Sequence, residues 1–503
     1  MFDSDFEKGR YHPLVLPEYN VPLTIDGLRE IFSSCSDFEV REIAFGLEKN
    51  VRLNVCWLDG IVSGGEVSSC VLRPLTQSAR AGNARDEAQA LAAVLCGAVY
   101  SCSVKQCTAM DETVSALTHG HCAVVFDALQ TALCFEVRSE NTRAISEPTL
   151  EKALKGAKDS FVETLRTNTA LVRRRICTPK LKLIESTVGR KSGTRVAVMF
   201  IDGVAAPETV KELAARLDAL DIDALLGVGI LEEGIVDAPF SPFPQLIHTE
   251  RPDRFSMYLM DGRVGLLVDG IPVGLVLPVT FAEFMKVTGD ANLHYLVSSV
   301  TAAVRYFSLA LSALLPAFYV AIAMYHQEMI PSRLLLSIIE AKQDVPFSTA
   351  LEVIGMLVAF TLLQEAGLRL PNPIGDTVSI IGALIVGQSA VEARVTSPIA
   401  IIVVALSGIA GYTLPSQDMG SAVRLVRFVL VLAAIAAGLF GVAAASCLIV
   451  FWLARIDSFG TSYTAPLSEA SPGSLSRLLL RKPKTQVKYR DPLLKTPDRR
   501  RQK

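Results

Sequence analysis

The sequence lacks the residue spacings by which common metal centres and enzymes are recognised. Its ten cysteines include no Cys-x-x-Cys pair, and the closest spacing, Cys102-x4-Cys107, matches no common zinc pattern. The run His119-Gly-His121-Cys122 has no fourth ligand nearby in the sequence, so we expect the thiols to pack as small apolar groups. Signatures of zinc proteases, serine hydrolases and kinases are also missing. We therefore expect no enzyme, no metal and no cofactor.

An excess of charge of one sign is missing too, because 49 Lys and Arg residues face 51 Asp and Glu residues, for a net charge of −2. This balance argues against nucleic acid as a partner. The first 20 residues contain four acidic side chains and no long apolar core, so no signal peptide is predicted. We expect the first half of the chain to stay in the cytosol, which suits reduced thiols.

Residues 1–300 alternate short apolar runs with amphipathic stretches, which is typical of domains that contain both strands and helices. We predict an α/β cytoplasmic region with an N-terminal subdomain over 1–140, a helical connector over 141–179 and a second α/β subdomain over 180–302. The predicted strands are 51–58, 122–126, 131–137, 195–202, 224–230, 263–269 and 273–277, and the predicted helices are 88–99 and 207–217.

Charged residues are missing from three long stretches after residue 303. The runs 306–325, 395–417 and 428–454 contain 20, 23 and 27 residues without one, and each is long enough to cross about 30 Å of hydrocarbon as a helix. The apolar segments 353–364 and 377–391 are marginal as complete spans. The pattern predicts an all-α multipass membrane domain over 303–456.

A basic cytoplasmic tail is predicted over 457–503, because residues 481–503 contain ten Lys or Arg and two Asp. Such a segment is retained in the cytoplasm and attracts anionic lipid. With both termini cytoplasmic, the number of crossings is even. The two short segments then contribute one crossing, as half-helices that meet around Pro371-Asn-Pro373 and face protein or water.

Four polar residues within this membrane half are candidates for lining a pore. A carboxylate at membrane depth usually faces a bundle interior or water, and rings of acidic side chains select cations. We expect the region 350–392 to line the pore rather than the apolar run 428–454. The alternative places the two glutamates in the headgroup zone. The pore candidates are Glu352, Gln364, Gln388 and Glu392.

Two charged groups in the cytoplasmic half are candidates for contact with another subunit or partner. One follows the predicted connector helix, and the other surrounds a Pro-Asp step before the predicted hairpin. The alternatives are a solvated charged face for the first group and internal ion pairs with Arg254 for the second. The candidates are Arg173, Arg174, Arg175, Glu250, Arg251 and Asp253.

Ordered motifs from about residue 50 to 465 give the chain a family resemblance. It resembles the A subunit of the GerA-type spore-germination receptor family, which also includes a sporulation paralogue, stage V sporulation protein AF. The connector 160–176 carries the longest of these motifs. The others are 59–61, 73–75, 188–190, 249–253, 262–264, 269–272, 326–331, 373–375, 387–388, 391–393, 397–398 and 458–460.

The resemblance implies a multipass protein of the spore inner membrane that acts in germination. It implies a homo-oligomer that passes monovalent cations, together with a transporter-like B-type subunit and a C-type lipoprotein subunit. Two alternatives stay open, namely a non-conducting scaffold that transmits a signal within the germination machinery and a sporulation-stage accessory paralogue. A secondary transporter is disfavoured, because the membrane half is small and has no internal repeat.

Overall fold

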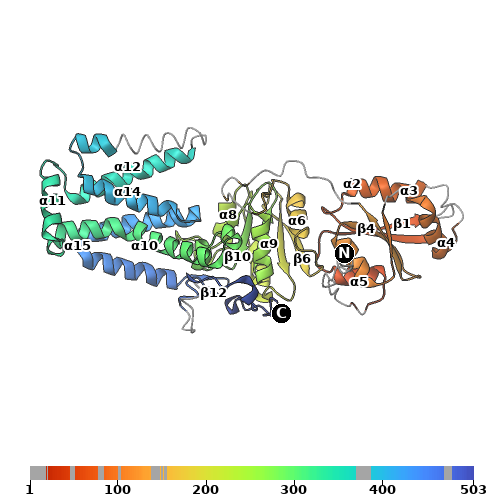
Figure 1. The fold of residues 1–503 in the computed structure, drawn as a ribbon. Coiled ribbons are helices and arrows are strands. Elements are labelled where there is room, and N and C mark those ends of the chain that lie inside the picture. Colours follow the sequence, from red (N-terminus) through yellow and green to blue (C-terminus); the bar gives the residue numbers. More distant parts are fainter. Residues whose placement is uncertain are drawn as a thin grey trace, which may run out of the picture. The chain divides into compact units, whose positions relative to one another are not determined.

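The structure is a computed structural model, and it describes residues 19, 21–45, 51–77, 84–99, 103–137, 148, 151, 156–369, 387–468 and 479–502. It divides into two compact units (Figure 1). The sheet unit comprises Met1–Ile235, His248–Pro278 and Lys488–Lys503, and the helical unit comprises Val236–Ile247 and Val279–Val487.

The first subdomain of the sheet unit has a five-stranded sheet with a hydrophobic core on each face. Side chains alternate along a strand, so β2 sends Val55 and Trp57 to one core and Cys56 and Leu58 to the other. Neighbouring strands are antiparallel. The sheet order is β1 (Phe38–Phe45), β2 (Val51–Leu58), β4 (His121–Phe126), β5 (Thr131–Glu136) and β3 (Val104–Cys107).

Helices cover both faces of this sheet. The first core includes residues of the π-helical turn Val67–Leu72 and of α3 (Arg73–Gln77), α4 (Glu87–Ala93) and the turn Val94–Ala98. The second core includes residues of α1 (Ile25–Ile31) and α5 (Met110–Thr118). A short helix, α2 (Gly64–Glu66), precedes the π-helical turn.

The second subdomain has another five-stranded sheet, in which β6–β7, β7–β9 and β9–β10 pair antiparallel. Phe255 packs so closely on it that a Cβ added at Gly265 would lie 2.1 Å from the phenyl ring. The sheet order is β6 (Leu181–Val188), β7 (Thr194–Ile201), β9 (Val264–Val268), β10 (Gly274–Leu277) and β8 (Ile247–Thr249), and the helices are α6 (Leu165–Arg173), α7 (Pro207–Asp218), α8 (Val228–Ile235) and α9 (Pro252–Asp261).

Most predicted elements of the two subdomains are confirmed. Strand 51–58 has the predicted bounds, helix 207–217 begins at Pro207, and the hairpin strands are β9 and β10. The strand predicted over 224–230 is wrong, because helix α8 begins within it at Val228. A short apolar run does not distinguish a strand from a helix by periodicity.

The basic C-terminal segment is folded rather than extended over its described part. Residues 488–502 lie against the α9–β9 turn of the sheet unit, where the Arg490 Nε donates to the Met260 carbonyl at 3.0 Å. Arg501 Nη1 lies 2.9 Å from Asp261 Oδ1. The Asp498 N–H donates to the Gly203 carbonyl at 3.1 Å. This segment therefore contributes to the second subdomain.

In its described part, the helical unit contains three helices that are long and apolar enough to cross a membrane, at Tyr295–Tyr325, Thr349–Gly367 and Gln417–Ala454. Helices α10, α12 and α14 run alongside one another (Figure 1). Its helices are α10 (Tyr295–Tyr325), α11 (Ser332–Lys342), α12 (Thr349–Arg369), α14 (Pro398–Tyr412) and α15 (Gln417–Ala454).

Two predictions for these segments are wrong. The segment 353–364, taken as a half-helix, belongs to the 21-residue helix α12, because helix continues through the polar residues at both of its ends. The run 395–417 is not one helix, because α14 within it has only 15 residues, with Pro398 in its first turn and Thr413 after its last one. Pro371 and Pro373 lie outside the described residues.

The predicted span 428–454 lies within α15, which is among the helices long and apolar enough to cross a membrane. Helix α15 is not continuous, however, because it breaks at Ala437 and Gly438, whose backbone angles are not helical. A Cβ added at Gly441 would lie 2.1 Å from the Ala433 carbonyl oxygen. Eight residues of a straight α-helix extend about 12 Å, so the chain folds back on itself here. The break divides α15 into two legs, one before Ala437 and one after Gly438. Val431 of the first leg and Val442 of the second lie in the same hydrophobic core.

Candidate functional site

Glu352, the first pore candidate, is buried within the helical unit. It lies in the first turn of α12 and is 4% exposed. Its Oε1 lies 3.3 Å from Lys342 Nζ at the end of α11, and its Oε2 accepts the Ser397 N–H at 2.9 Å. Ser397 is the N-cap of α14, where the helix dipole favours a negative charge. Glu352 therefore ties α11 and α14 to α12.

The other pore candidates lie apart from Glu352. Gln364 is twelve residues further along α12, which corresponds to about 18 Å, and its Oε1 accepts the Arg424 Nη1–H at 3.3 Å. Gln388 and Glu392 are exposed. The structure therefore does not bring the four residues together into one cluster within a single chain.

Two arginines near these candidates were missed by the sequence analysis, because the uncharged run was counted from residue 428. Helix α15 begins at Gln417 and so includes Arg424 and Arg427. Arg427 is 1% exposed, and its Nη1 donates to Ser407 Oγ at 3.0 Å. The Ser407 hydroxyl in turn donates to the Ser312 carbonyl at 2.9 Å. The signal available in the sequence was the i, i+3 spacing of two arginines beside a long apolar run.

Arg173, the first contact candidate, is 2% exposed and is used inside the chain. Its Nε and Nη2 donate to the two oxygens of Asp37 at 2.7 and 2.8 Å, and its Nη1 donates to the Leu181 carbonyl at 2.7 Å. Burial acts to lower the pKa of the guanidinium, but the Asp37 carboxylate outweighs it and the pKa is raised. This pair joins the first subdomain to the connector helix.

The two arginines that follow differ in exposure. Arg174 is exposed, whereas Arg175 Nη2 donates to the two oxygens of Asp159 at 2.7 and 2.6 Å. Of the three, Arg174 is therefore the one whose side chain remains accessible in the isolated chain.

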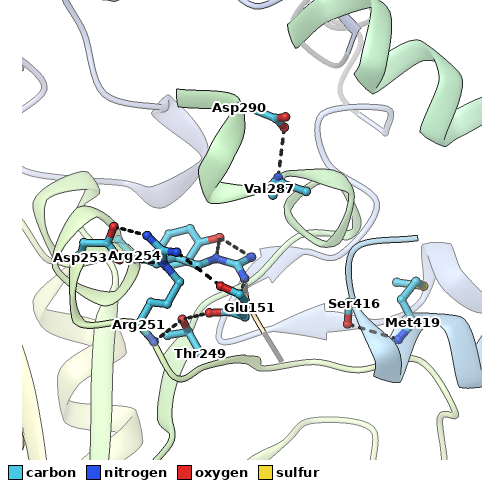
Figure 2. A network of polar contacts seen from close by, with 10 residues as sticks. Glu151, Thr249, Arg251, Asp253, Arg254, Val287, Asp290, Ser416 and Met419 are labelled. Carbon is cyan, nitrogen blue, oxygen red and sulfur yellow. Dashed lines mark hydrogen bonds and ion pairs between the residues drawn. The ribbon is translucent and has the colours of Figure 1, made fainter. Parts of the chain in front are cut away.

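The second contact group forms an internal polar network (Figure 2). Arg251 is 1% exposed, and its Nε and Nη2 donate to Asp253 at 3.0 and 2.7 Å. The Thr249 hydroxyl donates to Glu151 Oε2 at 2.6 Å, and Glu151 also pairs with Arg254. Hydrogen bonding to Asp253 raises the pKa of Arg251. These contacts fix the start of α9.

Five of the nine described cysteines are buried, namely Cys35, Cys56, Cys107, Cys122 and Cys134. Burial raises the pKa of Cys122 to about 12. In the run 119–122, His119 Nδ1 lies 2.7 Å from the Ser115 carbonyl oxygen, and His121 Nδ1 lies 3.1 Å from the Ala116 carbonyl oxygen. Within the described ranges, no group of three or more His, Cys, Asp or Glu is placed to hold a metal ion.

We expect a maleimide to label the exposed thiols of the native chain and to leave Cys122 unlabelled at both pH 7 and pH 9. The thiolate is the reactive form, and the folded Cys122 stays protonated until about pH 12. Peptide mass spectrometry before and after denaturation measures this. Labelling of native Cys122 that rises from pH 7 to 9 in step with exposed Cys177 would contradict it.

Comparison with known proteins identifies the family. The chain matches the model of the Bacillus/Clostridium GerA spore germination protein over residues 26–493. It is 34% identical to the uncharacterized membrane protein YfkQ of Bacillus subtilis (strain 168), over 92% of this chain and 89% of that protein. It is 34% identical to spore germination protein KA of the same organism, over 90% and 83%.

Two further relatives complete the comparison. Spore germination protein GerLA of Bacillus cereus is 32% identical, over 94% of this chain and 95% of that protein. The crystal structure of the N-terminal domain of the A subunit of the Bacillus megaterium spore germinant receptor GerK3 is 28% identical, with a TM-score of 0.41, over 50% of this chain and 92% of that one. The family match includes both five-stranded sheets and the three candidate membrane helices found among the described residues. The chain belongs to the Bacillus/Clostridium GerA spore germination protein family.

Proposed function

We propose that this chain is the membrane-embedded A-type subunit of a nutrient-germinant receptor in the spore inner membrane, and that copies of it assemble into a cation-conducting channel. The observation that carries the proposal is the family match over residues 26–493, which includes the sheets and the apolar helices together. Three helices of sufficient length and apolarity support a membrane location.

The proposal includes partners and topology. A transporter-like B-type subunit and a C-type lipoprotein subunit complete the receptor, and both termini of this chain are cytoplasmic. The lysines and arginines of residues 481–503 support this orientation and a contact with anionic lipid. The exposed Arg174 supports contact of the connector helix with another subunit, whereas Arg173 and Arg251 would act there only by shaping the surface.

The packing of Glu352 favours a second candidate function, a non-conducting scaffold. The carboxylate is enclosed and paired with Lys342, so in the described arrangement it stabilises helix packing and does not face an aqueous path. A conducting arrangement of α12 would require Glu352 to leave Lys342, or the ions to be coordinated by Gln364, Gln388 and Glu392 instead.

Deletion of the gene in its spore-forming host tests the receptor role. We expect the deleted spores to form normally and to lose the response to at least one nutrient, measured as the fall in optical density of a spore suspension. Restoring the gene should restore the response. Normal germination with every nutrient, combined with defective spore formation, would indicate the sporulation paralogue instead. Neighbouring genes for B- and C-type subunits would favour the receptor.

Neutralising Glu352 tests its role in conduction. In a conducting arrangement in which Glu352 has left Lys342, Glu352→Gln is expected to lower conductance or cation preference, because the amide carries no charge. Assembly should be kept, because the amide oxygen can still accept the Ser397 N–H. Lys342→Gln is the matched control, since it removes the ion pair and leaves the carboxylate charged. Single-channel recording measures both. Unchanged selectivity in Glu352→Gln would assign Glu352 to helix packing alone.

A further inference from the structure

Arg427 is a buried arginine whose Nε and Nη2, which carry three of its five N–H groups, have no hydrogen-bond partner among the described residues. It lies in α15 among its buried residues, and its sequence neighbours Val426 and Phe428 pack against the apolar core. Its Nη1 is held by Ser407. A buried charge without a counter-charge is strongly destabilising, so the arrangement requires an explanation.

The unused atoms form one edge of the guanidinium, and the same chain shows what this edge binds. Arg173 donates from Nε and Nη2 to the two carboxylate oxygens of Asp37 at 2.7 and 2.8 Å. Arg251 donates in the same way to the two carboxylate oxygens of Asp253 at 3.0 and 2.7 Å. The planar fork of two N–H groups matches the two oxygens of a carboxylate. At Arg427 the equivalent edge has no hydrogen-bond partner among the described residues.

Within the described residues, the neighbouring helices do not supply a carboxylate to this edge. Helices α10 and α14 contain no Asp or Glu in their sequences. In α12, Glu352 is paired with Lys342, and Glu365 is not a hydrogen-bond partner of Arg427 Nε or Nη2. The nearby Arg424 adds a second positive charge, and it donates hydrogen bonds to Gln364 and Ser421, which are neutral. The site therefore carries a local positive potential within an apolar bundle.

We propose that the Nε–Nη2 edge of Arg427 is a binding site for a carboxylate that comes from outside this chain. Because the edge is enclosed in the described arrangement, the carboxylate reaches it only when α14 and α15 separate. Binding then favours an opened arrangement of the helical unit, since a ligand shifts the equilibrium toward the state that it binds better. The proposal goes beyond the receptor role and does not depend on conduction.

The carboxylate has two sources that an experiment separates, namely a free small molecule and a side chain of another membrane polypeptide. The first arm uses the full chain in lipid nanodiscs with Val404→Cys, a position on α14 that is 2% exposed. Sodium acetate is compared with sodium chloride at equal ionic strength. Peptide mass spectrometry follows the rate at which a maleimide labels position 404.

We expect acetate to raise this rate several-fold with Arg427 present and not with Arg427→Lys, which keeps the charge but lacks the fork. Arg427→Met removes both, and Arg424→Lys is the matched control that should keep the response. This result assigns the site to a free carboxylate. An equal acetate effect in Arg427→Lys would overturn the proposal, because the effect then arises elsewhere.

The second arm uses the tagged chain purified from spore membranes. If acetate has no effect but membrane polypeptides that co-purify with the chain are lost in Arg427→Lys and kept in Arg424→Lys, the carboxylate belongs to a partner side chain. If acetate has no effect and the co-purified set is the same for Arg427→Lys and the unchanged chain, the proposal is wrong. Arg427→Lys decides these outcomes even where Arg427→Met fails to fold.

Discussion

Replacing Asp37 with Ala is expected to lower the free energy of unfolding of the sheet unit by about 3–5 kcal/mol, the cost of leaving a buried charge without its partner. Arg173 would lose both hydrogen bonds of its Nε–Nη2 edge in a site where it is 2% exposed. Trp57 is buried in this unit and Trp452 is the only other tryptophan. Urea unfolding followed by Trp57 fluorescence in a Trp452→Phe background measures the change.

Two further variants serve as comparisons for Asp37→Ala. Arg174→Ala, at the exposed neighbouring position, should change the unfolding free energy by less than about 0.5 kcal/mol. Replacing both partners, as Asp37→Leu with Arg173→Met, should recover much of the loss, because no buried charge then remains unpaired. A midpoint for Asp37→Ala equal to that of Arg174→Ala would show that the pair does not hold the two subdomains together.

Gly441→Ala is expected to destabilise the helical unit by about 3 kcal/mol, the upper range for overpacking a filled interior. The added Cβ would lie 2.1 Å from the backbone carbonyl of Ala433, which a side-chain rotation cannot relieve. The two legs of α15 would have to separate at the Ala437–Gly438 turn. Thermal unfolding of the full chain in detergent, followed by Trp452 in a Trp57→Phe background, measures this.

Gly420→Ala, in the same helix, is the matched control. No atom outside its own helical segment lies within 4 Å of the position of its Cβ, so the substitution should be neutral or should stabilise by up to about 1 kcal/mol through helix propensity. Equal stability of the two variants would contradict the close packing of the two legs, and with it the fold-back of α15.

The sheets could be predicted from the sequence where a strand stood between clear turn signals. Strand 51–58 and the hairpin β9–β10 are such cases. The strand β1, which exposes several polar side chains, carries too weak an alternation to be recognised. The 224–230 prediction failed because a run of seven residues fits both a strand and one buried face of a helix.

The structure of the membrane half was harder to predict from the sequence, because the length of an apolar run shows only that the segment can be buried in lipid. It does not show where a helix turns back, so the break at Ala437–Gly438 could not be predicted from it. Polar residues were judged by depth along the sequence, whereas their partners come from other helices. Glu352 meets Lys342 and Ser397, and Arg427 meets Ser407. The function was predicted from the family resemblance, because composition, periodicity and charge pattern alone do not predict it.

Recording from planar lipid bilayers tests whether copies of this chain form a cation-conducting channel of the germination machinery. The purified full chain is added on one side, and Gly441→Ala, whose helical unit is expected to be destabilised, serves as the control for contaminating currents. We expect discrete openings whose reversal potential shifts toward the cation value under a salt gradient. A correctly folded, membrane-inserted protein that gives no discrete currents, or currents that reverse at the anion value, would contradict the claim.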